Sequence, residues 1–249
     1  MKPKTYYHGT NPRNLYGIIT QGFKLLGEES HGRVHGAGLY IATKPETAAY
    51  WADQAFVHRA HYAIKCQVQE GTRVLWKETD YDKKVIRSLE KEFGKGISRN
   101  YDFWKLIPHN KQLTTKELRA LVTHLDYAIG YAGWGTKKTG RESDKKYAHL
   151  KRFSRLLRQY GYDALGDRTE SCWDSDEILV YNPSRVIPVS VHRLNVVWER
   201  DKWEPTSVDY SHPLPLDEIK KISEEEEADW QKWEAEYDAE EIARKAKEA

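Results

Sequence analysis

Three short segments, far apart along the chain, carry side chains that could do chemistry together. The first is Tyr7-His8-Gly9-Thr10, the second places Tyr50 ten residues after Tyr40, and the third begins at Glu177. An imidazole can hydrogen-bond to hydroxyl groups, aromatic rings can stack on a flat ligand, and a carboxylate can face a developing positive charge. Taken singly, each has an ordinary explanation: a turn histidine, packed tyrosines and a solvated acid at the start of a strand.

In this order and spacing, the segments resemble the His-Tyr-Glu branch of the ADP-ribosyltransferases, which is the branch of the poly(ADP-ribose) polymerases. The resemblance covers residues 5–70 and 160–197. The turn Gly161-Tyr162-Asp163-Ala164 and the run Asn182-Pro183-Ser184 look like those of small bacterial and phage members of that fold. The family binds NAD and breaks the bond between nicotinamide and ribose, through a transition state with oxocarbenium character.

The resemblance implies a catalytic role for Glu177, His8 and Tyr40. Glu177 would hydrogen-bond the 2′-hydroxyl of the nicotinamide ribose, stabilise the developing positive charge and help to orient the acceptor. His8 would hold the hydroxyls of the adenosine-side ribose. Tyr40 and Tyr50 would stack on the two faces of the nicotinamide ring.

The resemblance adds further contacts to NAD from small residues. The backbone of Gly9 would approach the carboxamide, Thr10 would extend the same motif, and the hydroxyl of Thr47 would bond the carboxamide. No metal is expected, because His31 and His35 are four residues apart but lack a third ligand with clear spacing.

The loop before Glu177 is expected to face the acceptor. Arg168 could reach a phosphate and Trp173 could stack on a base, or both could simply pack within the loop. Ser175 stands two residues before Glu177, where the arginine-modifying branch of the superfamily carries an acidic or amide residue. This difference weighs against an arginine acceptor.

Composition indicates a soluble chain with a basic body and an acidic tail. The formal net charge of the 249 residues is +2, but residues 201–249 hold 16 acidic and 7 basic residues, a net charge of −9. Residues 1–200 therefore carry +11, which favours anionic partners. No apolar stretch approaches the roughly 18 residues that span a bilayer, and no secretory signal is recognisable at the start. The two cysteines form no CxxC pair, so we expect a cytoplasmic setting.

The resemblance implies an α+β fold of the ADP-ribosyltransferase type, with a split antiparallel β-sheet core. Local patterns add a helical insertion at 79–160 and a C-terminal acidic helix. Residues 1–198 would form the catalytic domain, 199–215 a linker, and 216–249 the acidic tail. The spacing of apolar residues, and the Gly and Pro residues that interrupt it, predict further elements. Strands are expected at 5–7, 23–25, 38–42, 61–68, 73–76, 177–181, 186–189 and 191–198, and helices after Pro12 and after Thr43.

Three functions remain open from the sequence. The leading hypothesis is a mono-ADP-ribosyltransferase that modifies nucleic acid, slightly favoured, or protein, as a toxin or phage–host conflict effector. The alternatives are an NAD glycohydrolase that uses water as acceptor, and an inactive module that binds nucleic acid or ADP-ribose. The acidic tail is either a solvated helix with i, i+4 charge pairs, or a segment that shields the basic face or docks an antitoxin or other regulator.

Overall fold

The computed structural model describes eight segments of the chain, and every structural statement below concerns them. They are residues 4–24, 38–48, 62–77, 82–93, 112–133, 157–167, 175–198 and 205–248. Tyr50, Arg168 and Trp173, which were predicted to contact NAD or the acceptor, lie outside these segments.

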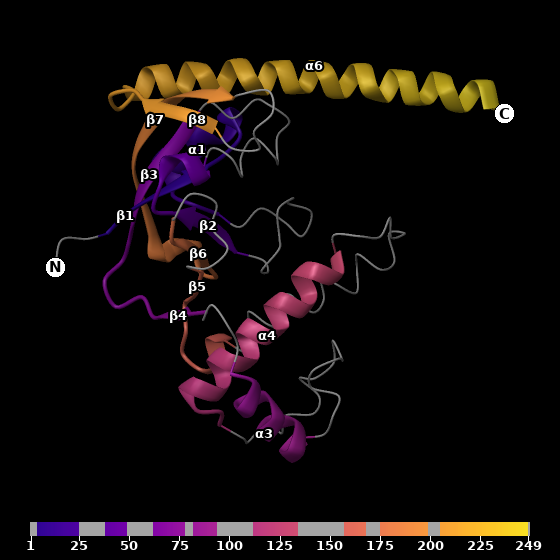
Figure 1. Cartoon of the computed structure of the whole chain (residues 1–249). Helices are drawn as coiled ribbons and strands as arrows, with labels where there is room; N and C mark the ends of the chain where they lie inside the picture. The colour runs from indigo at the N-terminus through magenta and orange to yellow at the C-terminus, as the bar shows by residue number, and fades with distance from the viewer. Residues whose placement is uncertain are drawn as a thin grey trace.

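The described strands form one mixed sheet (Figure 1). Its spatial order is β4-β5-β6-β2-β1-β3-β7-β8, and all neighbouring strands are antiparallel except the parallel pair β4–β5. The predicted α+β, ADP-ribosyltransferase-like fold class is therefore confirmed. The strands are β1 (Thr5–Gly9), β2 (Leu39–Ala42), β3 (Tyr62–Val68), β4 (Val74–Trp76), β5 (Ala164–Asp167), β6 (Glu177–Val180), β7 (Val186–Trp198) and β8 (Pro205–Tyr210).

One row of residues crosses six of these strands in register. Directly opposed residues of antiparallel strands have side chains on the same face of the sheet. This row brings Glu177 of β6 beside Ala42 of β2, although the two residues belong to opposite halves of the chain. From β5 to β7 the row is Asp167, Glu177, Ala42, Tyr7, Lys65 and Ser190.

Successive side chains along each strand point to opposite faces of the sheet, so the apolar core is divided between the two faces. Ile41, Ile64 and Ile178 pack with Leu15 of helix α1 (Leu15–Gln21) and Ile219 of helix α6 (Leu216–Glu248). On the other face, a second cluster joins strand residues to helices α3 (Lys83–Phe93) and α4 (Thr115–Gly133). Its members include Leu75, Leu165, Leu179, Leu89 and Leu121. In Figure 1, α1 and α6 lie at one end of the sheet and α3 and α4 at the other.

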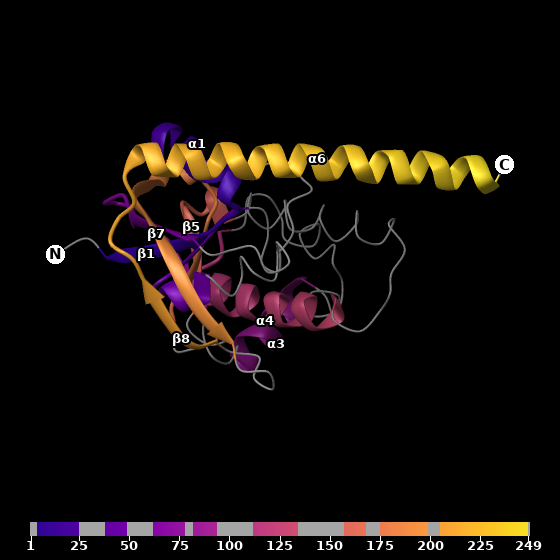
Figure 2. The same cartoon turned by 90° about the horizontal axis from the view of Figure 1, so that it is seen from above.

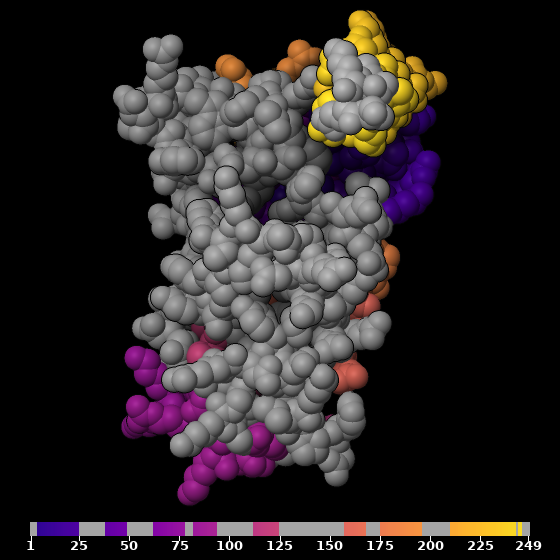
Figure 3. Space-filling model, turned by 90° about the vertical axis from the view of Figure 1, so that its right-hand side faces the viewer, coloured from indigo at the N-terminus to yellow at the C-terminus, as the bar shows by residue number. Residues whose placement is uncertain are grey.

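Helix α6 is docked by its N-terminal half, up to Trp230. Ile219 is buried, and the Ser223 hydroxyl donates to Pro12 O at 2.9 Å and accepts from Tyr16 N at 3.1 Å. Further along, the Arg13 guanidinium lies 4.3 Å from the centroid of the Trp230 ring. Beyond that contact the helix extends away from the sheet, with Trp233 and Tyr237 about half exposed (Figures 1 and 2). Seen end-on in Figure 3, α6 lies over the N-terminal segment.

Three sequence-based expectations are corrected by the structure. Residues 22–24 are irregular, so the described part of the expected strand 23–25 is not a strand. Phe23 instead lies in the core. The predicted linker 199–215 contains β8, which pairs with β7. The expected strands 186–189 and 191–198 form the single strand β7. It tolerates Pro188, which has no N–H to donate, because a register shift lies between Lys65 and Cys66 opposite it.

Of the described helices, none has the length and apolar character that crossing a membrane would require.

Candidate functional site

Tyr40 and Glu177 lie close together on one face of the sheet. Tyr40 is in register with Leu179, and Glu177 is in register with Ala42, so the two side chains are diagonal neighbours on β2 and β6. Both line one small cavity, together with residues of β5, β6 and the end of β4. These further lining residues are Lys77, Leu165, Asp167, Ile178 and Leu179. The structure thus joins two of the three residues predicted to be catalytic.

His8 lies on the next strand, and its ring bonds to the main chain of Tyr40. The distance from His8 Nδ1 to Tyr40 O is 2.8 Å. Because a carbonyl oxygen only accepts hydrogen bonds, Nδ1 must carry the proton, which makes Nε2 an acceptor in the neutral ring. The ring also packs edge-on against Phe23, with 5.3 Å between centroids. His8 therefore connects to the Tyr40–Glu177 cavity through the Tyr40 carbonyl and does not belong to the residues that line it.

Burial lowers the pKa of His8 below its ordinary value, and the hydrogen bond to Tyr40 opposes that effect only in part. The folded protein therefore holds this imidazole neutral at pH 7. A neutral ring whose Nε2 accepts hydrogen bonds suits a partner that carries hydroxyl groups.

This lowered pKa predicts how stability depends on pH. As pH falls below about 6.5, His8 takes up a proton in the unfolded chain before it does so in the folded protein, so the free energy of unfolding decreases. We expect the Tm of the His8→Gln variant to fall less between pH 7.5 and pH 5.5 than that of the unmodified chain. Thermal unfolding by circular dichroism at both pH values measures the difference. His212→Gln, at an exposed histidine, serves as the control, and equal slopes in all three proteins would contradict the prediction.

Other predicted NAD contacts surround this strand end. Gly9 is the last residue of β1 and pairs with Ala63, and Thr10 directly after it is buried. Asn11 then caps the short helix η1 (Pro12–Asn14), with its side chain accepting from Arg13 N at 3.1 Å. Thr47 is completely buried in the helical turn that follows β2. The roles of Gly9, Thr10 and Thr47 toward NAD stay predictions.

The start of β6 is clamped to the end of β2. Thr43 N donates to Asp176 O at 2.9 Å, and Asp176 N donates to the Thr43 hydroxyl at 2.9 Å. The hydroxyl of the buried Ser175 accepts from Lys44 N at 3.3 Å. These bonds fix the backbone on the N-terminal side of Glu177 and give Ser175 a structural task.

A buried ion pair beside Glu177 was not anticipated from the sequence. The Lys77 ammonium contacts the Asp167 carboxylate, and their side chains are only 3% and 9% exposed. Nothing around Lys77 distinguishes it locally from a surface lysine. Its importance depends on the pairing of β4 with β5, which brings together residues far apart in the chain.

A polar contact on β1 was likewise missed. Burial, followed by a hydrogen bond to Tyr210, raises the pKa of Tyr7 to about 12, and the nearby Glu46 carboxylate adds to the effect. Tyr7 is the direct neighbour of Ala42 in the row that contains Glu177. The phenol therefore stays protonated and neutral at physiological pH.

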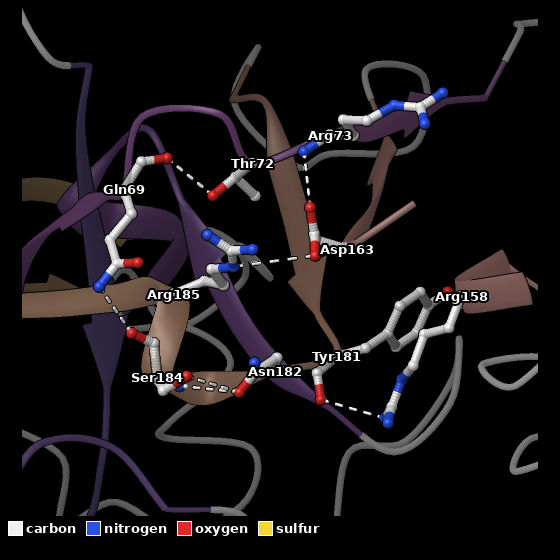
Figure 4. Close-up of polar contacts among 9 residues, drawn as sticks. All are labelled: Gln69, Thr72, Arg73, Arg158, Asp163, Tyr181, Asn182, Ser184 and Arg185. Carbon is white, nitrogen blue, oxygen red and sulfur yellow. Dashed lines mark hydrogen bonds and ion pairs between the residues drawn. The ribbon is translucent and has the colours of Figure 1, made fainter. Parts of the chain in front are cut away.

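A larger cavity, of about 440 Å³, lies at the opposite end of β5 and β6. Figure 4 shows the polar contacts around it. Asp163 accepts from Arg73 N at 2.9 Å and lies 3.8 Å from Arg185 Nε, and Arg158 donates to Tyr181 O at 3.2 Å. Tyr181 is four residues beyond Glu177, or about 13 Å along an extended strand, so this cavity lies away from the Glu177 carboxylate. These contacts hold the chain turns together and bring none of the predicted site residues into this cavity.

Among the described residues, no group of three or more His, Cys, Asp or Glu side chains could hold a metal ion. His31 and His35 lie outside those residues.

Residues 1–118 match the family model of the poly(ADP-ribose) polymerase catalytic domain. The matched range contains His8 and Tyr40 and ends in α4, well before Glu177. The match supports the predicted kinship with NAD-dependent ADP-ribosyltransferases, and it extends further into the helical region than the resemblance in the sequence does. Comparisons with curated proteins and with solved structures find no match.

Proposed function

We propose that the chain is a mono-ADP-ribosyltransferase that cleaves NAD and transfers ADP-ribose to a macromolecular acceptor. The observation that carries this proposal is the placement of Glu177 and Tyr40 at one cavity, with the His8 ring bonded to the Tyr40 carbonyl. The family match to residues 1–118 supplies the class of chemistry.

In the proposed reaction, Tyr40 stacks on nicotinamide and His8 Nε2 accepts a hydrogen bond from a hydroxyl of the adenosine-side ribose. The Glu177 carboxylate accepts a hydrogen bond from the 2′-hydroxyl of the other ribose and faces the positive charge that develops at C1′. The bond between C1′ and the ring nitrogen breaks, and nicotinamide leaves as a neutral molecule. The acceptor nucleophile then bonds to C1′ and releases its proton.

Incubation with NAD labelled in the adenosine part tests the proposal. Transfer predicts label on a macromolecule together with free nicotinamide. Release of ADP-ribose with no labelled macromolecule would favour hydrolysis by water, and no NAD turnover with any cell extract would favour a binding module. Biotin-labelled NAD in cell lysate, followed by separate RNase, DNase and protease digestion, identifies the acceptor class.

We propose nucleic acid as the acceptor, because residues 1–200 carry a net charge of +11. Loss of the label on RNase or DNase digestion, but not on protease digestion, is the expected result. Modification of the cell's own nucleic acid would make the enzyme a toxin or conflict effector in the cytoplasm. Induced expression should then arrest growth, and Glu177→Gln should relieve the arrest. Arrest of equal strength by both proteins would contradict the toxin role.

We propose that the acidic face of α6 restrains access of nucleic acid to the basic body. Glu224, Glu225 and Glu227 are exposed and lie directly after Ser223, whose hydroxyl bonds to Pro12 O. Changing these three glutamates to glutamine preserves Ile219 and Ser223. It should therefore leave Tm nearly unchanged while strengthening binding to a single-stranded oligonucleotide at low salt, by roughly threefold to tenfold.

Fluorescence anisotropy at two salt concentrations measures this effect, which should shrink as salt screens the charges. Changing Glu236, Asp238 and Glu240 to their amides removes the same number of charges from the part of α6 beyond Trp230 and should have a smaller effect. Equal binding by all three proteins at low salt would eliminate the shielding role and leave α6 as a solvated helix or a docking segment for a regulator.

A further inference from the structure

The Glu177 carboxylate has a second carboxylate beside it, on the adjacent strand and on the same face of the sheet. Asp167 of β5 is in register with Glu177 of β6, and the two side chains share one face. Directly opposed residues of antiparallel strands have Cβ atoms about 4.5–5.5 Å apart. Two carboxylates this close, beside a cavity, disfavour each other's ionised form, so one of them tends to retain a proton.

Lys77 is placed to cancel one of these charges. Its backbone N donates to Gly166 O at 2.8 Å, which extends the β4–β5 ladder by one residue and carries the side chain to Asp167. The Lys77 side chain is 3% exposed and its ammonium contacts the Asp167 carboxylate. Lysine is almost never this deeply buried unless it is paired.

The pair has little value for stability alone. Burying two charges costs several kcal/mol per ion, and replacing a buried pair by apolar residues of similar volume is often neutral or stabilising. A role in the site fits its position better, since Lys77 and Asp167 line the cavity that also contains Tyr40 and Glu177.

We propose that the Lys77–Asp167 ion pair is a positioning device that keeps the Glu177 carboxylate ionised for the reaction at this cavity. The inference rests on the proposed function. On the β2 side of Glu177, the nearest titratable side chain among the described cavity residues is Tyr40. Tyr7 of β1 is one strand further away, separated from Glu177 by the uncharged Ala42. The charges of Lys77 and Asp167 cancel, so Glu177 carries the net negative charge of the cavity.

Two single substitutions should move the pH profile of NAD turnover in opposite directions. Lys77→Met leaves Asp167 and Glu177 as neighbouring carboxylates, so the acidic limb of kcat should shift upward by about one pH unit or more. That shift means about tenfold lower kcat at a pH on this limb and recovery at high pH. Asp167→Asn leaves the ammonium beside Glu177, so the limb should shift downward. KM for NAD should change less than kcat in both variants.

The double variant Lys77→Met/Asp167→Asn removes both charges and keeps the side-chain shapes. It should restore the acidic limb of the unmodified enzyme, whereas a purely structural pair predicts unshifted limbs and losses that do not recover with pH. Carboxyl ¹³C NMR titration, with the Glu177 resonance identified from Glu177→Gln, provides the same comparison without turnover. Should a single variant fail to fold, the double variant still has to titrate like the unmodified chain.

If both single variants kept the acidic limb of the kcat–pH profile where it is in the unmodified chain, and Glu177→Gln were inactive, this inference would be overturned and the proposed function would stay intact. Full activity of Glu177→Gln would instead overturn the proposed function.

Discussion

Replacing Glu177 with glutamine is expected to reduce NAD-dependent transfer by at least about 100-fold, because a preorganised group that faces transition-state charge typically contributes 10²–10³ in rate. Glutamine keeps the size of the side chain and can still hydrogen-bond, but it loses the negative charge. The loss should therefore appear in kcat, while the KM for NAD changes little. Labelled-NAD turnover under saturating conditions measures it.

Glu70→Gln is a suitable control, since Glu70 is exposed in the turn after β3 and the chemical change is identical. It should leave turnover unchanged. Thermal unfolding of both variants verifies that the fold is intact. If Glu177→Gln retained more than a tenth of the original kcat, the carboxylate would not carry the role assigned to it.

Replacing Gly166 with alanine is expected to destabilise the fold by about 3 kcal/mol, as overpacking a tight core contact does. A Cβ atom at this position would lie 2.3 Å from Cε3 of Trp76 and 2.7 Å from its Cδ2, so it would meet the flat indole ring itself. Trp76 is packed against the core and Gly166 lies between β4 and β6, so neither side yields easily. Denaturant unfolding gives the free energy directly.

Gly17→Ala provides the matched control for that experiment. Gly17 lies within α1, and a Cβ atom added there would have no neighbour within 4 Å, so alanine should stabilise by about 0.5–1 kcal/mol through helix propensity. Adding Trp76→Leu to Gly166→Ala should recover part of the loss. Equal unfolding free energies for Gly166→Ala and Gly17→Ala would show that the β4–β5 contact is not tight.

The sequence was most informative where its signals are local. The runs around His8, Tyr40 and Glu177 are short, apolar and bounded by Gly, Pro or Asn, so their strands and their family resemblance were both recognisable. The C-terminal helix was predicted from its acidic and alanine-rich composition, and α6 does begin at Leu216.

What the sequence could not supply depends on pairings between distant strands. Lys77 resembles a surface lysine until β4 pairs with β5, and Asp167 becomes a neighbour of Glu177 only through the β5–β6 register. The strand β8 was missed because Pro205 and the polar residues around it favour a linker, and it is its pairing with β7 that makes it a strand. The side-chain bond from His8 to the Tyr40 carbonyl depends in the same way on β1 and β2 being adjacent.

The order of the strands also determines when the proposed site can be completed during synthesis of the chain. The pairing of β2 with β6 can form only after β6 has been made, because the clamp between Thr43 and Asp176 joins residues 133 positions apart. Contacts of such separation form late and slow the folding of a sheet. A ribosome-bound chain that has released only its first half therefore holds the imidazole and the tyrosine without the glutamate. The proposed site is therefore complete only once nearly the whole protein has been made.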